Sequence, residues 1–225
     1  MTDTEPLPFV EAVRRSLEIE ERGAHVRTAL TLTCNLALAP AQLWPLLVDR
    51  SELAHWYGQL NGSLSEGGRY RLADGTQGQV LELVEPHKLS LTCEKDGEAD
   101  PLQIRLDPED DGTTSLRLTH TTLIDREDFD RYGPGAAAIH WEIAVMALAS
   151  RTGGWSTCGD CVPMPTPQWL EGSDGAAHLQ AWSVRWAAEA LAAGVDEASA
   201  RRGELATSRA CQEDPPAMAG MTPEG

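Results

Sequence analysis

The sequence has few basic residues and no long apolar run, and each absence excludes a class of protein. It carries 18 Lys and Arg against 35 Asp and Glu, a net charge of −17. A surface this acidic repels phosphate groups, so nucleic acid and anionic membranes are not expected as partners. No apolar stretch reaches the roughly 18 residues that a bilayer-spanning helix needs, so no membrane span is predicted.

Cysteines and targeting signals are also scarce. Five cysteines in 225 residues are few and odd in number, so no disulfide framework is indicated. The N-terminal residues have neither the basic stretch nor the apolar core of a signal peptide, and we expect a cytoplasmic protein. The sequence lacks a Walker loop, a dinucleotide fingerprint, a nucleophile elbow and an H-E-x-x-H motif, so no cofactor is expected.

The N-terminal segment has the spacing of a short amphipathic helix. Phe9, Val13 and Leu17 recur every four residues, and acidic residues follow them. Gly23 is a residue type that often ends a helix. The prediction is therefore a helix over residues 8–22, within an N-terminal segment of residues 1–23.

Residues 24–150 have the pattern of an antiparallel sheet with one long helix. Apolar and polar residues alternate strictly over residues 25–36, which predicts a half-buried strand. Two short helices are expected between Pro40 and Tyr57. Short alternating runs separated by Asp-Gly turns follow, and these predict a meander of further strands, about seven in all.

The segment 136–150 predicts a buried helix, because apolar residues cover nearly every side of it. The apolar face of the sheet is the surface on which such a helix would pack. A strand, two short helices, about six short strands and a long helix, in this order, make the helix-grip arrangement. This is an α+β fold in which a curved sheet grips a helix and encloses a pocket.

The C-terminal third has a different character. Residues 151–211 begin as a loop rich in glycine and proline and continue with helical patterns over 175–193 and from Asp196 onward. Residues 212–225 are polar with three prolines, so a disordered tail is predicted. The fold therefore carries a helical C-terminal extension.

Several different short motifs follow one another along residues 24–150. They are Ala39-Pro40-Ala41-Gln42-Leu43-Trp44, Asp49 with Leu53 and Trp56, Gly67-Gly68-Arg69-Tyr70, Gly78-Gln79-Val80, Glu85-Pro86, Asp111-Gly112-Thr113, Leu116-Arg117-Leu118-Thr119-His120 and Gly133-Pro134-Gly135. In order and spacing they resemble the homologues of the activator of heat-shock protein 90 ATPase, in the START-like (SRPBCC, polyketide cyclase) superfamily. Ala136 departs from the pattern, since an aromatic residue often follows Gly-Pro-Gly.

The resemblance implies a cavity used for hydrophobic or amphipathic small molecules. Some relatives carry out chemistry in this cavity, and others act on chaperones. No catalytic residue is common to the superfamily, so the resemblance assigns no active site.

Eight residues are candidates for the pocket. They are Trp44, Trp56, Tyr57, Tyr70, His120, His140, Trp141 and Glu142. The aromatic residues fit the core as well as a pocket wall. His120 continues the inward column of Leu116 and Leu118, where it can orient a ligand, act as a base or be an ordinary core histidine. His140 and Glu142 interrupt an apolar helix, so they face the cavity or reach an exposed edge.

Cys158 and Cys161 form a C-x-x-C motif, which is typical of a redox pair or of half a zinc site. His178 is a conceivable third metal ligand. A redox pair, however, needs its first cysteine at a helix N-terminus, whereas two prolines follow here, and no second C-x-x-C exists. The alternative is two free thiols in a loop.

These observations predict a protein that binds a hydrophobic or amphipathic small molecule without transforming it. One alternative is an enzyme of the cyclase or hydratase kind that uses His120, His140 or Glu142 as acid or base. Another alternative, suggested by the resemblance, is an interaction protein associated with a chaperone.

Overall fold

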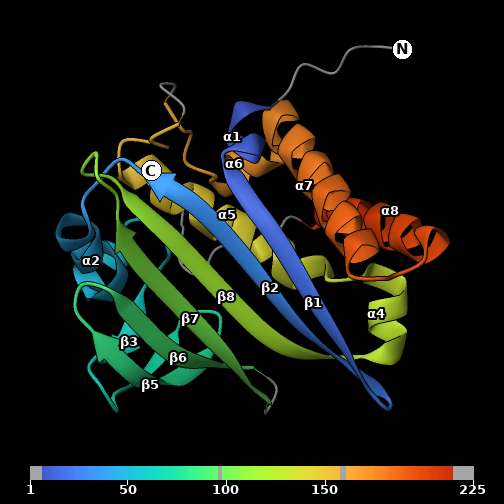
Figure 1. The fold of residues 1–225 in the computed structure, drawn as a ribbon, viewed down its shortest axis with the longest axis horizontal. Helices are drawn as coiled ribbons and strands as arrows, with labels where there is room; N and C mark the ends of the chain where they lie inside the picture. Colours follow the sequence, from blue (N-terminus) through green and yellow to red (C-terminus); the bar gives the residue numbers. More distant parts are fainter. Residues whose placement is uncertain (1–6, 96–97, 158–160, 215–225) are drawn as a thin grey trace.

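An antiparallel sheet forms the centre of the computed structural model, which describes residues 7–95, 98–157 and 161–214 (Figure 1). Within these residues it has eight strands in the order β1-β2-β8-β7-β6-β5-β4-β3. They are β1 (Val13–Arg22), β2 (His25–Leu36), β3 (Leu60–Gly62), β4 (Arg69–Leu72), β5 (Gln77–Val84), β6 (Lys88–Lys95), β7 (Glu98–Pro108) and β8 (Thr114–Asp125). The predicted α+β helix-grip fold is confirmed, with one strand more than the seven expected.

Helices surround the two ends and the inner face of this sheet. They are α1 (Pro8–Glu11), α2 (Pro40–Val48), α3 (Arg50–Leu53), α4 (Arg126–Tyr132), α5 (Gly135–Arg151), α6 (Pro167–Glu171), α7 (Ser173–Ala192) and α8 (Glu197–Glu213). Among the described residues, none of these helices is both long enough and apolar enough to cross a bilayer.

The predicted N-terminal helix is wrong, since only α1 is helical and residues 13–22 form strand β1. This strand pairs with β2 from Val13↔Cys34 to Arg22↔His25, across a turn in which Gly23 has a φ of 69°. The four-residue spacing misled the prediction because four is a multiple of the strand period of two as well as close to a helical turn. Strand β1 points Val13, Arg15 and Leu17 inward, and the charged Arg15 hides the alternation.

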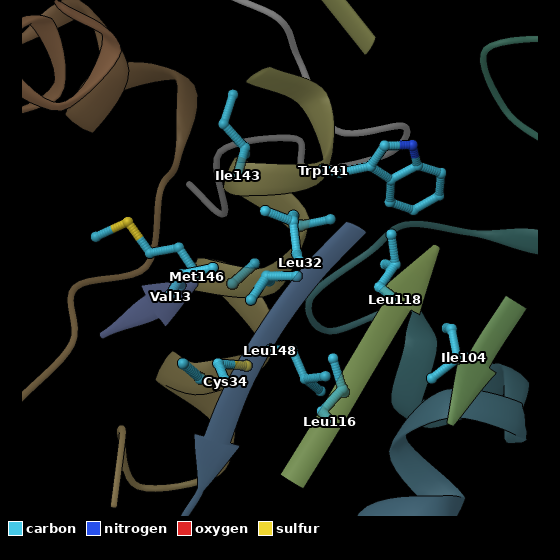
Figure 2. Close-up of a cluster of buried hydrophobic side chains, with 14 of the residues drawn as sticks. Val13, Leu32, Cys34, Ile104, Leu116, Leu118, Trp141, Ile143, Met146 and Leu148 are labelled. Atoms are coloured by element: carbon cyan, nitrogen blue, oxygen red, sulfur yellow. The ribbon is translucent and has the colours of Figure 1, made fainter. Parts of the chain in front are cut away.

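Helix α5 is buried on all sides, as its sequence predicts. Ile139, Ile143 and Ala147 have no exposed surface. One side of α5 packs on the sheet, while α7 and α8 contact its other side. Figure 2 shows contacts with the sheet, where Trp141 lies near Leu118 on β8 and Met146 lies near Val13 on β1.

The predicted C-terminal extension is therefore part of the core. Helix α7 contacts β1 and α5, and α8 contacts α4, α5 and α7. Asp196 caps α8, as its position predicts, because its Oδ1 accepts a hydrogen bond from the backbone N–H of Ser199 at 3.0 Å. Helix α8 continues through Glu213, so the predicted disordered tail is wrong at residues 212 and 213, and Asp214 caps the helix. Residues 215–225 of the predicted tail lie outside the described residues.

Candidate functional site

A small cavity lies between α5 and the inner face of the sheet. Its volume is about 70 Å³. Leucines from five strands and the two short helices make most of its wall, and α5 closes it on the other side. The lining residues are Leu47, Leu53, Trp56, Tyr57, Leu60, Leu64, Tyr70, Leu72, Leu89, Leu91, Cys93, Leu102, Ile104, Leu116, Leu118, Trp141, Ala144, Val145 and Leu148.

Most polar atoms in this wall already have partners. The Tyr70 hydroxyl donates to the backbone oxygen of Thr92 at 2.7 Å, and the Trp56 indole N–H donates to the backbone oxygen of Leu46 at 2.9 Å. Burial raises the pKa of the Cys93 thiol to about 11, so this group is uncharged at neutral pH. The wall therefore offers an almost wholly apolar surface.

An aromatic group closes the cavity near the N-terminal half of α5. The rings of Tyr57 and Trp141 are stacked with centroids 6.4 Å apart, and His140 meets Trp141 edge-on at 5.0 Å. Burial raises the pKa of the Tyr57 hydroxyl, so it stays neutral. Tyr57 itself is only partly buried.

His120 stands behind Trp141, with ring centroids 5.4 Å apart, and does not line the cavity. Its Nε2 lies 3.9 Å from Oδ2 of Asp100, which accepts a hydrogen bond from the Thr122 hydroxyl at 2.6 Å. Burial lowers the pKa of His120 to about 4 and raises that of Asp100. The imidazole is therefore neutral at physiological pH, and its buried Nδ1 has no hydrogen-bond partner among the described residues.

Glu142 does not face the cavity, because it turns toward β1 and the C-terminal extension. Arg15 on β1 donates Nε to Glu142 Oε1 at 2.5 Å and Nη2 to Oε2 at 2.9 Å. The Trp186 indole N–H on α7 donates to the same Oε1 at 2.8 Å. Burial raises the pKa of Glu142, while Arg15 and Trp186 act in the opposite direction. This carboxylate joins three elements of the core.

Four of the eight candidate residues thus line the cavity: Trp56, Tyr57, Tyr70 and Trp141. Trp44 packs in the core on α2, and His140 is half-buried beside Tyr57 and Trp141. Asp100 was missed by sequence reasoning, although its even spacing from Leu102 and Ile104 places it in the same inward column.

Two of the three candidate metal ligands, Cys161 and His178, lie within the described residues. Cys158 lies outside the described residues, and Cys161 is a free, exposed cysteine. The His178 ring packs against Phe9, Trp169 and Trp182. In the part of the chain that the structure describes, no three His, Cys, Asp or Glu side chains are grouped to hold a metal ion.

Comparison with protein families gives one match. A family model described as Activator of Hsp90 ATPase homolog 1-like protein matches residues 37–158, which is more than half of the chain. A search of the curated proteins found no match.

Solved structures share the fold. The crystal structure of CalU16 from Micromonospora echinospora has 20% sequence identity, a TM-score of 0.58, and covers 82% of this chain and 99% of its own. The solution NMR structure of CalU16 gives 19% identity and a TM-score of 0.61, covering 86% and 100%. A crystallised HSP90 activator from Plasmodium falciparum, at 21% identity, covers 41% of this chain and 71% of its own with a TM-score of 0.38. The two CalU16 structures show that this chain shares their fold.

Proposed function

The chain belongs to the family of Activator of Hsp90 ATPase homolog 1-like proteins, and from this premise we propose that it binds an apolar small molecule between its sheet and α5. The observation that carries the proposal is the wall of that cavity, where the polar atoms of Trp56 and Tyr70 are already bonded to backbone. A ligand there is stabilised by about 25 cal/mol for each Å² of apolar surface it buries and needs no polar group.

The size of the cavity limits the ligand. Ligand pockets commonly have volumes of roughly 300–1,000 Å³, whereas this one has about 70 Å³. A single aromatic ring or a short alkyl group is the kind of group it accepts without change. A larger ligand has to displace part of the wall, and Tyr57 is best placed to move, because it is only partly buried.

Binding is favoured over reaction by the state of the acid–base candidates. His120 lies beside Trp141 and does not line the cavity, and Glu142 is held by Arg15 and Trp186 on the far side of α5. Neither side chain touches the space in which a ligand would lie. Association with a chaperone, which the family's description suggests, stays a prediction that a pull-down with Hsp90 tests.

A matched pair of alanine substitutions on α5 tests the proposal. Ala144 lines the cavity and Ala147, equally buried, does not. We expect Ala144→Leu to fold with little loss of stability, because its added carbons enter existing space, while Ala147→Leu overpacks the core and costs about 1–3 kcal/mol.

Ligand binding is measured as the change in melting temperature on addition of toluene, indole or naphthalene. Binding of any of these probes raises the melting temperature of the wild type and of Ala147→Leu, but not of Ala144→Leu. The proposal fails if none of the probes stabilises the wild type, or if Ala144→Leu is stabilised to the same extent.

A further inference from the structure

A second and larger cavity lies on the opposite side of α5. Its volume is about 420 Å³, within the range of small-molecule sites. Helices α4, α7 and α8, gathered at one end of the sheet in Figure 1, enclose it together with the start of α5 and part of β1. It shares no lining residue with the cavity between the sheet and α5. Helices α7 and α8 follow the matched residues 37–158, so the cavity depends on the C-terminal extension.

Part of the inner surface of this cavity is apolar and aromatic. Phe129, Ile139 and Trp186 line it, and all three are buried. The hydrogen bond from the Trp186 indole N–H to Glu142 fixes the orientation of the ring. Small residues of α7, Ala187 and Ala190, leave room beside it.

Charge in the lining is predominantly negative. Four carboxylates, from Glu21, Asp130, Asp196 and Glu204, line the cavity with a single basic residue, Arg126. Arg126 is already paired with Glu21 and lies 3.8 Å from Asp130. A second negative charge brought by a ligand would therefore meet repulsion rather than a free cation.

Glu204 is the polar group that points to a ligand. Its side chain is 6% exposed, and Oε2 accepts a hydrogen bond from Arg201 Nη1 at 2.7 Å. Its other oxygen, Oε1, has no hydrogen-bond partner among the described residues. This oxygen is not one of the fully buried atoms that lack a partner, so it is open to solvent, and an ammonium group that replaces water there would form a charge-assisted hydrogen bond.

We propose that this cavity binds an organic cation, an ammonium group carried on an apolar body. The ammonium donates to Oε1 of Glu204, and the body packs against Phe129 and Trp186, whose rings also attract a cation. A neutral ligand with a hydroxyl group can also donate to the Glu204 oxygen, but that hydrogen bond is weaker because only one of its partners is charged. An anion is repelled by the four carboxylates. The net charge of −17 further concentrates cations around the protein.

The test compares three probes that share one apolar body and differ in charge: phenylbutylamine, phenylbutanol and phenylbutyrate. Isothermal titration calorimetry on the full chain should give the amine an affinity about tenfold or more above that of the alcohol, with no binding of the carboxylate. Glu204→Gln should abolish this preference for the amine. Arg201→Ala is the matched control, since it removes the neighbouring cation and should leave the preference intact or increase it.

Several results would overturn the proposal: failure of the amine to bind, equal affinities for amine and alcohol, or an unchanged preference in Glu204→Gln. Circular dichroism checks that each variant is folded. If Glu204→Gln does not fold, the N,N,N-trimethyl derivative of the amine is titrated into the wild type instead, because it keeps the positive charge but cannot donate a hydrogen bond to Glu204. A trimethyl derivative that binds as tightly as the amine would then count against the proposal.

Discussion

The buried ion pair between Arg15 and Glu142 makes a quantitative prediction about how the C-terminal extension is attached. The two side chains are 4% and 1% exposed, so water screens neither charge. In Glu142→Gln the guanidinium of Arg15 keeps its charge but loses its counter-ion, and an amide replaces the oxygen that accepts from Trp186. Breaking a buried pair in this way costs about 3–5 kcal/mol.

That loss is a large share of the stability of a domain, which is of the order of 5–15 kcal/mol. For a chain of this length it corresponds to a fall in melting temperature of about 10 °C. Urea denaturation followed by circular dichroism measures the free energy of unfolding directly. Because Glu142 joins α5 to α7, Glu142→Gln should also expose the extension to limited proteolysis before the sheet.

Two further variants test the reasoning. Glu52→Gln removes one partner of an exposed pair, in which Arg151 lies 3.7 Å away, and should cost less than about 1 kcal/mol. Arg15→Met combined with Glu142→Met removes both buried charges and should recover most of the stability that Glu142→Gln loses. If Glu142→Gln cost no more than Glu52→Gln, Glu142 would not be buried between α5 and α7, and the attachment described above would be wrong.

Three other predictions concern the sheet. Because the pKa of His120 is about 4 in the fold and near 6.5 in the unfolded chain, the unfolded state takes up its proton first as the pH falls. Stability therefore declines between pH 6.5 and 4 by up to about 1.4 kcal/mol per pH unit, and urea denaturation of His120→Leu should lack this part of the decline. Gly78→Ala places a Cβ 1.8 Å from the Thr92 backbone oxygen on the neighbouring strand, so thermal unfolding should reveal a loss of about 1–3 kcal/mol or more. Tyr70→Phe removes the hydrogen bond to that oxygen and should cost about 0.5–1.5 kcal/mol in urea; no loss would mean that the hydroxyl is solvated instead.

Local pattern alone determined much of this fold. Strict alternation in β2 and β8 and the Asp-Gly turns between later strands identify the meander, because side chains of a strand alternate between a buried and an exposed face. Helix α5 is recognisable as a buried helix because apolar residues cover all its sides. The sequence could not say that its second side is covered by α7 and α8, since burial on all sides leaves the covering element unspecified.

Strand β1 and the position of Glu142 were decided by tertiary structure. Arg15 breaks the apolar column of β1, and the chain tolerates this charge only because Glu142 lies opposite, 127 residues away. For the same reason the side chain of Glu142 points toward β1 and not into the cavity. Periodicity reports the neighbours of a residue along the chain, whereas a buried charge is positioned by its partner in space. Two neighbouring candidate residues on α5 therefore have different roles. Trp141 lines the cavity, whereas Glu142 binds Trp186 and so holds the C-terminal extension on the core.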